Sequence, residues 1–310
     1  MLSQIKGLHH VTSIASGARV NSDFFTRVLG LRRVKTTVNF DRPDVYHLYY
    51  GDRRGTPGTV MTYFPFPDRA RGQRGPGEVS ATSFSVPEGA LRFWEARLAE
   101  LGVTGLARDS RMGAARLRFE GPDGDGFSLV ETQDARAPWC VGDIPEAAAI
   151  RGLHSAELWL DPRESEAAAE LLRFMGYDQT GSEGEVTRYA VGGTDGAQVL
   201  DVRACPGKPA EQGAGSVHHI AFRVTDSAAQ AQVRAALMDT GFQVTPVRDR
   251  DYFTAIYFRA PGGILFEVAT DEPGFDRDED MAHLGETLKL PRQHAHLRDQ
   301  LAAVLEPLEA

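Results

Sequence analysis

GLHHVTSIAS, residues 7–16, decides the fold because its pattern returns as GLHSAELWLD at residues 152–161. A second echo links VSATSFSVPE, residues 79–88, with SVHHIAFRVTD, residues 216–226. Each segment is β-rich or alternates polar with apolar residues, which indicates a β-strand. The four segments predict four related strands, and their spacing of roughly 65–75 residues indicates an internal repeat.

A helical pattern follows each of these strands and ends in glycine, the residue that most easily takes the positive φ found after a last helical turn. The predicted helices are Ser22–Gly30, Ala90–Gly102, Glu164–Gly176 and Ala228–Gly241. Short strands follow each helix. In the second and fourth units, LRFEGPDGDGFSLVET and IYFRAPGGILFEVATD read as matched hairpins with Pro and Gly at the turn. The repeating unit is therefore β-α-β-β-β, present four times.

These units predict an α+β fold in which four βαβββ modules pair into two curved-sheet, pseudo-barrel cups, because one such sheet alone leaves an apolar face uncovered. We expect an N-terminal half over residues 1–138, with modules one and two, and a C-terminal half over residues 149–275, with modules three and four. Strand and helix signals lapse between Ala137 and Ala148, where a linker fits. Residues 276–310 form a tail with an amphipathic helix around His296–Leu305.

Composition excludes several classes of function. The net charge of −9 and the isoelectric point near 5.5 argue against a nucleic-acid or anionic-membrane partner. No apolar run approaches the ~20 residues that span a bilayer, and the N-terminal segment lacks a signal-peptide core, so we expect a cytoplasmic protein. Cys140 and Cys205 form no CxxC pair, which argues against a thiolate metal site or a disulfide framework. A homo-oligomer remains compatible with the sequence.

Adjacent histidines occur at equivalent positions in two of the four units. They are His9 and His10 in the first unit, and His218 and His219 in the fourth. Because side chains alternate across a strand, one histidine of each pair should face the interior of the paired sheets, but strand parity alone does not choose which. The corresponding residues of the second and third units are Ser80, Ala81, His154 and Ser155.

Glu267 lies in the closing strand of the fourth unit between Phe266 and Val268. A carboxylate in such an apolar strand is costly to bury unless it is paired or binds a metal. The second unit has Ser128 at this position, and the closing strand of the first unit, VMTYF, offers no acidic residue. Two imidazoles and one carboxylate form the facial triad of non-haem Fe(II) oxygenases, although Mn(II) accepts the same ligands. We therefore expect units one and four to form a metal-binding cup and units two and three an empty one.

The chain resembles the hydroquinone-type ring-cleaving dioxygenases of the vicinal-oxygen-chelate superfamily. That superfamily's fold is shared by glyoxalases, bleomycin-resistance proteins and extradiol dioxygenases. The resemblance covers nearly the whole chain and rests on LHHVTS, YHLYYGDRRGTPGTVMTYFPFP, HHIAFRV, YFRAPGGILFEVATDEPGF and DEDMAHLGETLKLP. It implies that the second histidine of each pair and the closing-strand glutamate bind iron. The implied metal ligands are His10, His219 and Glu267.

The resemblance also implies an extradiol-type reaction in the degradation of aromatic compounds, in which a small aromatic substrate and O2 both reach Fe(II). The implied catalytic residues are Thr12, His218, Arg250 and Tyr257. In this interpretation His218 accepts or returns a proton, Arg250 stabilises anionic oxygen, Tyr257 donates a hydrogen bond, and Thr12 orients a ligand or a water. Phe40, Phe64 and Phe66 are candidates for the pocket wall, although core packing would also explain them.

Two other functions use the same repeat. A glyoxalase-like isomerase or lyase would want a fourth protein ligand, and the lack of an acidic residue in VMTYF argues against it. A non-enzymatic small-molecule binding protein of the antibiotic-sequestering type would leave the two histidines and the glutamate unexplained.

Overall fold

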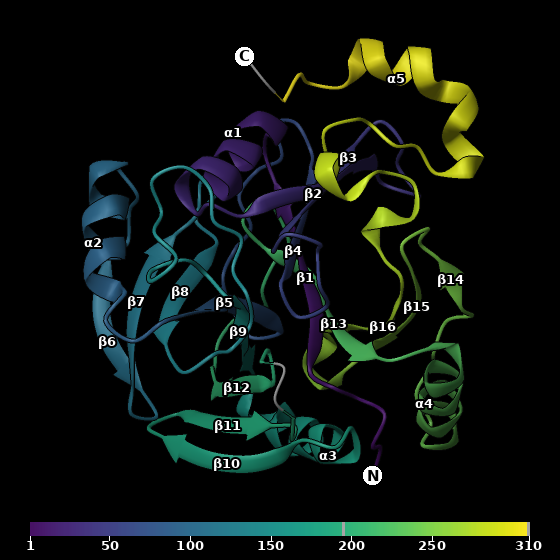
Figure 1. Ribbon diagram of the computed structural model, residues 1–310. Coiled ribbons are helices and arrows are strands. Elements are labelled where there is room, and N and C mark those ends of the chain that lie inside the picture. Colours follow the sequence, from purple (N-terminus) through teal and green to yellow (C-terminus); the bar gives the residue numbers. More distant parts are fainter. Residues whose placement is uncertain (194–195, 309–310) are drawn as a thin grey trace.

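The computed structural model describes residues 1–193 and 196–308, whose strands form two eight-stranded, curved sheets (Figure 1). One sheet, called the outer cup because it joins the first and last units, has the strand order β14-β15-β16-β13-β1-β4-β3-β2. The other, called the inner cup, joins units two and three in the order β10-β11-β12-β9-β5-β8-β7-β6.

The two cups are built from strands of similar length. The outer cup contains β1 (Leu8–Ala15), β2 (Arg32–Val38), β3 (Tyr46–Gly51), β4 (Val60–Pro65), β13 (Val217–Val224), β14 (Arg248–Asp249), β15 (Phe253–Arg259) and β16 (Leu265–Pro273). The inner cup contains β5 (Glu78–Val86), β6 (Ala107–Arg111), β7 (Ala114–Glu120), β8 (Gly126–Glu131), β9 (Gly152–Leu160), β10 (Asp178–Glu183), β11 (Val186–Ala190) and β12 (Val199–Ala204).

The predicted pairing of units is confirmed. β1 lies antiparallel to β13 at the centre of the outer cup, and β5 lies antiparallel to β9 at the centre of the inner cup. Each cup thus takes strands from both halves of the chain. The division into halves at residues 1–138 and 149–275 stays a prediction.

Each unit carries one helix on the outside of its sheet (Figure 1). These are α1 (Ala18–Asp23), continued by a π-helical turn η1 (Phe24–Val28), then α2 (Leu91–Glu100), α3 (Ser165–Phe174) and α4 (Ser227–Asp239). The glycines that follow them, Gly30, Gly102, Gly176 and Gly241, all have positive φ, as predicted. The first helix begins four residues earlier than predicted, at Ala18 instead of Ser22, because its first turn is short of the apolar residues that mark a helix in the sequence.

All four central strands have a β-bulge at the first residue of the repeated pair. His9, Ser80, His154 and His218 are each skipped in the register between β1 and β13 or between β5 and β9. A bulge places one extra residue on a strand and redirects its side chain. The prediction that the two histidines of a pair face opposite sides of a sheet assumed a regular strand. Because of the bulges, strand alternation does not determine which way these side chains point.

The C-terminal tail runs along the outer cup. It contains η4 (Phe275–Arg277), η5 (Met281–His283), η6 (Arg292–Leu297) and α5 (Arg298–Val304), so the α-helix predicted around His296–Leu305 begins at Arg298 and follows a 3-10 segment. Two further 3-10 turns, η2 (Pro162–Glu164) and η3 (Pro261–Gly263), lie in the units. The Nζ of the fully buried Lys35 on β2 lies 2.6 Å from Oδ1 of Asp278, which fastens the tail to the sheet.

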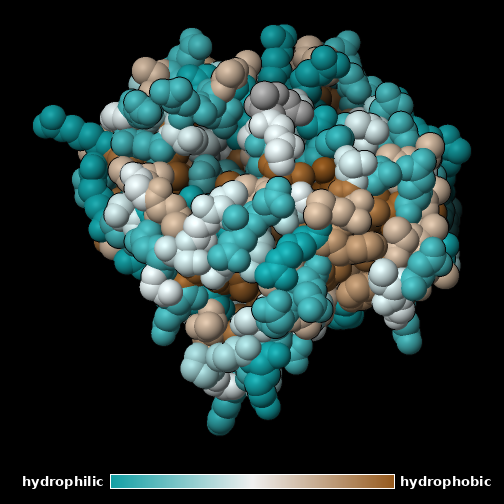
Figure 2. Space-filling view, turned by 90° about the horizontal axis from the view of Figure 1, so that it is seen from below, coloured by the Kyte–Doolittle hydropathy of each residue, from teal (hydrophilic) through white to brown (hydrophobic). Residues whose placement is uncertain are grey.

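The core lies between the sheets and under the helices, with Trp94, Phe25 and Phe84 among its fully buried side chains. Seen from below, the surface is mostly hydrophilic, and hydrophobic residues show mainly in recessed areas (Figure 2). None of the helices within residues 1–193 and 196–308 is both long and apolar enough to cross a membrane.

Candidate metal centre

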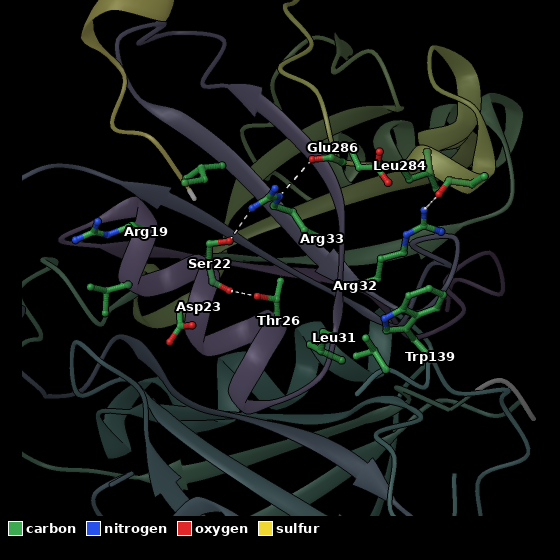
Figure 3. Close-up of a pocket in the computed structure, with 15 residues that line it drawn as sticks. Arg19, Ser22, Asp23, Thr26, Leu31, Arg32, Arg33, Trp139, Leu284 and Glu286 are labelled. Atoms are coloured by element: carbon green, nitrogen blue, oxygen red, sulfur yellow. Dashed lines mark hydrogen bonds between the residues drawn. The ribbon is translucent and has the colours of Figure 1, made fainter. Parts of the chain in front are cut away.

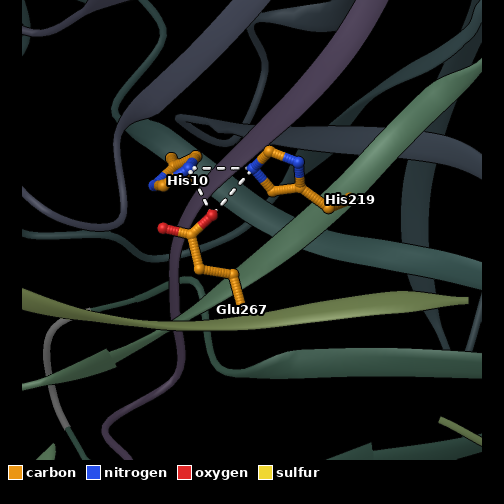
Figure 4. A group of neighbouring side chains, drawn as sticks. All are labelled: His10, His219 and Glu267. Atoms are coloured by element: carbon orange, nitrogen blue, oxygen red, sulfur yellow. Dashed lines mark hydrogen bonds and ion pairs between the residues drawn. The ribbon is translucent and has the colours of Figure 1, made fainter. Parts of the chain in front are cut away.

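His10, His219 and Glu267 come together inside the outer cup, although they lie on three different strands (Figure 4). Nε2 of His219 lies 2.9 Å from Oε2 of Glu267 and 3.4 Å from Nε2 of His10, and the third separation, His10 Nε2 to Glu267 Oε2, is 3.7 Å. Atoms that bind one ion at ~2.0–2.2 Å and at right angles are separated by roughly 3 Å. The three side chains therefore converge as ligands of a single cation would.

The neighbouring histidines hold the two imidazoles in place. Nδ1 of His9 lies 2.9 Å from Nδ1 of His10, and Nδ1 of His218 lies 2.7 Å from Nδ1 of His219. With a cation bound at Nε2 of His10 and of His219, their Nδ1 atoms would carry the hydrogen and donate it to the neighbour. A ligand histidine whose second nitrogen is held in this way has a fixed ring orientation and tautomer.

Burial keeps both imidazoles in the form that binds a metal. His10 is 1% exposed and His219 is 5% exposed. Burial lowers the pKa of His219 from 6.5 to about 3 and places the pKa of His10 well below 6.5. Both side chains are therefore neutral at pH 7, and the neutral imidazole is the metal-binding form.

Glu267 provides the test of whether the site fits a cation. Its side chain is fully buried, and neither carboxylate oxygen receives a hydrogen bond of good geometry from the described residues. Burial raises the pKa of Glu267, although the neighbouring His10 and Arg250 oppose the shift. A buried carboxylate left in this state costs several kcal/mol, and a bound divalent cation would remove that cost. The residues present fit a metal ion with two nitrogen ligands and one oxygen ligand.

The centre opens into a cavity of about 430 Å³. Its walls are mainly aromatic and include the three predicted residues Phe40, Phe64 and Phe66, together with Phe253, whose ring centroid lies 5.1 Å from that of His10. His218 also lines this cavity, because the bulge in β13 turns its side chain toward the same space as His219. A ring-shaped, largely apolar ligand would fit against these walls.

The other predicted site residues surround the centre at different depths. Tyr257 on β15 pairs with Glu267 in the sheet register, and its hydroxyl accepts a hydrogen bond of 3.1 Å from Nε of Arg250. Both residues line the cavity. Thr12 is fully buried and is not among the described residues that line the cavity. Its Oγ1 lies 2.8 Å from Oγ1 of Thr62.

Sequence reasoning missed His47 and Tyr49, which also line the cavity. The Tyr49 hydroxyl lies 2.8 Å from Nδ1 of His47, and Nε2 of His47 lies 2.9 Å from Oγ1 of Thr62. A buried chain of hydrogen bonds thus runs from Tyr49 through His47 and Thr62 to Thr12. The repeat held a signal for it, because Tyr49 pairs with Thr62 in the register as Tyr257 pairs with Glu267.

Thr62 therefore stands where the first unit would carry a counterpart of Glu267. Thr62 pairs with Thr12, two residues after His10, just as Glu267 pairs with Ala221, two residues after His219. In this register the first unit has a threonine hydroxyl where the fourth unit has the Glu267 carboxylate.

The inner cup holds a carboxylate that the sequence comparison overlooked. Asp201 pairs with Glu157, two residues after Ser155, and so corresponds to Glu267. Its two oxygens accept hydrogen bonds of 2.8 and 2.9 Å from Nε and Nη2 of Arg188. The inner cup thus contains an ion pair at the position of the metal centre.

A larger cavity of about 920 Å³ lies on the outside of the outer cup, between α1, β2 and the C-terminal tail (Figure 3). Arg32 donates hydrogen bonds to the carbonyl oxygens of Arg53 and Ala282, and Arg33 donates to Gly285 O and Ser22 Oγ. These arginines join the tail to the sheet. None of the three metal-centre residues lines this cavity.

Comparison with known proteins gives consistent matches. Residues 160–268 match the family model described as the Glyoxalase/Bleomycin resistance protein/Dioxygenase superfamily. The chain is 42% identical over 310 residues to "Putative ring-cleaving dioxygenase MhqO" of Bacillus subtilis, with 100% of this chain and 98% of that protein covered. It is 37% identical to "Chlorohydroquinone/hydroquinone 1,2-dioxygenase" of Sphingobium indicum, with 96% of this chain and 95% of that protein covered.

Solved structures agree with these matches. The crystal structure of a "putative dioxygenase" from Bacillus subtilis has a TM-score of 0.94 at 41% identity and covers 99% of this chain and 98% of its own. Glyoxalase I from Zea mays, at 13% identity and a TM-score of 0.61 over 86% of this chain and 92% of its own, shares the fold alone. The chain belongs to the ring-cleaving dioxygenases, oxidoreductases of the glyoxalase/bleomycin resistance protein/dioxygenase superfamily.

Proposed function

We propose that this protein is a non-haem Fe(II) dioxygenase that opens hydroquinone-type aromatic rings with O2, and that His10, His219 and Glu267 are its metal ligands. The observation that carries the proposal is a buried, neutral His-His-carboxylate set at the base of an aromatic-lined cavity. The likeness to a protein named for hydroquinone 1,2-cleavage supports the choice of substrate class.

Fe(II) would supply open coordination positions for a phenolic oxygen and O2, and the electron transfer that spin-paired organic molecules do not readily make to triplet O2. The same three ligands accept Mn(II). Thr62, at the position where a fourth protein ligand would stand, bears only a hydroxyl that is already hydrogen-bonded to Thr12. This arrangement supports a dioxygenase and argues against a glyoxalase-like isomerase, which would want that position filled by a carboxylate.

Arg250 and Tyr257 would act together on anionic oxygen. The guanidinium of Arg250 lies over the rings of both Phe40 and Tyr257, 5.2 and 5.4 Å from their centroids. It thus faces the cavity with its charge partly shielded from water, where an electrostatic interaction with a phenolate is stronger than at the surface. The Tyr257 hydroxyl accepts from Arg250, and its own hydrogen can be donated either to Glu267 or to a substrate oxygen.

His218 would hold a proton at Nε2. Its Nδ1 accepts the hydrogen of His219, so a neutral His218 carries its own hydrogen on the other nitrogen. Burial lowers the pKa of His218 to about 3, which keeps the ring neutral at pH 7. A neutral His218 would therefore donate a hydrogen bond from Nε2 to a substrate oxygen, and it could release that hydrogen as a proton only if Nδ1 took up a proton in exchange. Thr12 would act through Thr62 and β1, because it is separated from the cavity.

The bond cleaved follows from the substrate class. In a para-dihydroxybenzene no two hydroxyl-bearing carbons are adjacent, so cleavage beside a hydroxyl must fall between one hydroxylated and one unsubstituted or halogen-bearing or alkyl-bearing carbon. The reaction is therefore of the extradiol type in this proposal. Both atoms of O2 enter the ring-opened product.

Oxygen uptake with hydroquinone tests the proposal. Protein loaded with Fe(II) under argon should consume one O2 per hydroquinone once oxygen is admitted. Ring opening is measured by the loss of aromatic absorbance and by mass spectrometry of the product. Catechol, whose hydroxyls are adjacent, is the comparison substrate. An Fe(II)-loaded protein that binds hydroquinone but consumes no O2 would point to the binding-protein alternative, and activity on a thiol adduct with Zn²⁺ or Ni²⁺ would point to the isomerase.

A further inference from the structure

The C-terminal tail contacts the loop that forms one wall of the metal-centre cavity. The loop spans residues 39–45, between β2 and β3, and Asn39, Phe40, Asp41 and Arg42 line the cavity. The tail is fixed along β2: the amide of Lys289 donates to Thr36 O at 2.9 Å, and Thr36 and Leu288 form a β-bridge. Figure 1 shows this segment, in yellow, passing over the β2 side of the outer cup.

The loop satisfies most of its own backbone. Asn39 Oδ1 accepts from the amides of Asp41 and Arg42 at 2.8 and 3.1 Å, and the amide of Asn39 donates to Val45 O at 2.8 Å. Such side-chain-to-backbone bonds define a compact turn. They leave the carbonyl of Phe40 for another partner.

Two tail residues converge on that carbonyl. Nε2 of Gln293 lies 2.9 Å and Nε2 of His294 lies 2.8 Å from Phe40 O. A ring nitrogen this close to a carbonyl oxygen must carry the hydrogen, so both groups donate, one to each lone pair. These hydrogen bonds join Phe40 to tail residues that lie more than 250 positions away in the sequence.

Phe40 in turn contacts Arg250, one of the arginines that line the cavity. Its ring lies 5.2 Å from Cζ of Arg250, and the Tyr257 ring lies 5.4 Å from the same atom. The guanidinium is thus held between two aromatic rings, a geometry that contributes more as water is removed. Displacement of Phe40 would free Arg250 to rotate and would widen the cavity.

We propose that Phe40 determines which ring substituents the cavity accepts, and that Gln293 and His294 are positioning residues that act on the site through Phe40. This inference rests on the proposed function for its substrate class. It gives the tail a role in recognition in addition to covering the sheet.

The test uses the full chain loaded with Fe(II), in two measurements that need no turnover. Hydroquinone and tert-butylhydroquinone are titrated under argon by calorimetry, and hydrogen–deuterium exchange is followed over residues 39–45. The variants are Phe40→Leu, the double change Gln293→Ala with His294→Ala, and Gln293→Ala with His294→Gln, whose amide can again donate to Phe40 O. His296→Ala is the matched control, because His296 is exposed on the same 3-10 segment.

The double alanine variant should bind hydroquinone about tenfold more weakly, which corresponds to ~1.4 kcal/mol and lies within the range of a partly desolvated cation–π contact. Exchange over residues 39–45 should accelerate, and the preference for hydroquinone over tert-butylhydroquinone should narrow. Phe40→Leu should change binding in the same direction without faster exchange. The variant that combines Gln293→Ala with His294→Gln should restore hydroquinone binding and loop exchange to the parent values. His296→Ala should behave as the parent in both measurements, and every variant should keep the parent's metal affinity. In oxygen-uptake assays KM should change more than kcat.

Unchanged binding and unchanged loop exchange in the double variant would overturn the inference, as would an equal effect of His296→Ala. Failure of the proposed function is distinguishable. In that case the parent binds hydroquinone under argon and consumes no O2, while the variants still change affinity and loop exchange. A parent protein that binds neither hydroquinone nor tert-butylhydroquinone would overturn both the inference and the proposed substrate class.

Discussion

The outer and inner cups share a backbone and differ in what their ligand positions carry. In the outer cup the equivalent positions hold His10, His219, Thr62 and Glu267, and in the inner cup they hold Ala81, Ser155, Ser128 and Asp201. Both cups keep the bulge before each central-strand position. The backbone that places a metal site is therefore a property of the repeat and does not depend on a metal.

The partners of the two carboxylates account for the difference. Asp201 is held by both arms of Arg188, with Nη1 of Arg111 3.6 Å from its Oδ2. Glu267 has no arginine in bonding contact among the described residues, because the nearby Arg250 donates to Tyr257 instead. A buried carboxylate that already has a guanidinium partner has little to gain from a cation, whereas one without a partner has much to gain.

The largest expected effect comes from exchanging the two carboxylates for neutral residues. Glu267→Ala should lower metal affinity by more than the roughly 10–100-fold that loss of an outer hydrogen-bonding partner causes, and oxygen uptake should be lost. The apo protein should be no less stable than the parent, because a costly buried charge is gone. Asp201→Asn should keep the metal and lose roughly 3–5 kcal/mol of stability, since Arg188 is left uncompensated. Calorimetric metal titration and urea unfolding of both variants check this.

His10→Ala and His219→Ala should also lose metal and activity while remaining folded. Metal retention in His10→Ala combined with metal loss in His9→Ala would show that the wrong member of the first histidine pair is assigned as ligand.

The next effect concerns the residues that line the outer cavity. His218→Phe and Tyr257→Phe should keep the metal and slow turnover by roughly 10²–10⁴-fold, the range for a lost positioned acid or base. His9→Phe alters the equivalent bulge residue, which does not line this cavity, and should weaken metal binding more than it slows the loaded enzyme. Single-turnover oxygen consumption separates the two behaviours. Parent rates in both His218→Phe and Tyr257→Phe would remove them from the chemical step.

A smaller effect should follow from filling the fourth position of the outer cup. Thr62→Glu, or Thr62→Asp if the longer side chain disturbs folding, should tighten Mn(II) binding by about tenfold, one added ligand contact of ~1.4 kcal/mol. Turnover should fall because an open coordination position is taken. Ser128→Glu is the matched change in the inner cup and should create no metal binding. Unchanged Mn(II) affinity in both Thr62 variants would contradict the placement of that side chain.

A separate effect, on the apo protein, is graded acid lability. Burial lowers the pKa of His9, His218 and His219 to about 3 each, and the pKa values of His10 and His47 also lie well below 6.5. The unfolded chain therefore binds more protons than the folded one between pH 6.5 and about 3. Apo stability should fall as pH falls through this window, by up to about 1.4 kcal/mol per pH unit for each histidine.

The inner cup should resist acid longer. It has one such histidine, His154, whose pKa is lowered by burial to about 4. Burial alone would raise the pKa of Glu157, but Trp159 and Arg111 bring it below its usual value, so the contribution of Glu157 to stability is lost only as pH falls through that lowered value. Hydrogen exchange at pH 5 should show the strands of the outer cup opening first, and bound metal should delay this. Simultaneous opening of both cups at pH 5 would refute the prediction that the buried histidines make the outer cup the more acid-labile one.

The sequence predicted much of this structure because the repeat supplies its own comparison. The helix ends at Gly30, Gly102, Gly176 and Gly241, the pairing of units one and four, and the convergence of the histidines with Glu267 all follow from aligned positions. Glu267 could be found because its neighbours on the strand are apolar. The choice of His10 over His9 came from the family resemblance.

Other features depend on geometry that one strand does not reveal. The bulges at His9 and His218 are irregularities of pairing, so strand parity could not place these side chains. Asp201 and Tyr49 were missed because they become equivalent to Glu267 and Tyr257 only through the sheet register. The contact of His294 with Phe40 O joins segments 254 residues apart without a periodic signal.

The order of the units along the chain also has a consequence for biosynthesis. Contacts between β5 and β9 close a loop of about 70 residues, as between Ser85 and Gly152, 67 positions apart, whereas His10 and His219 are separated by 209. A ribosome would release the last strand of the inner cup, which ends at Ala204, before β13 begins at Val217, and short loops cost less entropy to close. The inner cup can therefore form first and hold β1 until its partner is synthesised. Pulse-labelled refolding should show protection of β5 and β9 before β1 and β13, which would make the inner cup the template on which the outer cup is assembled.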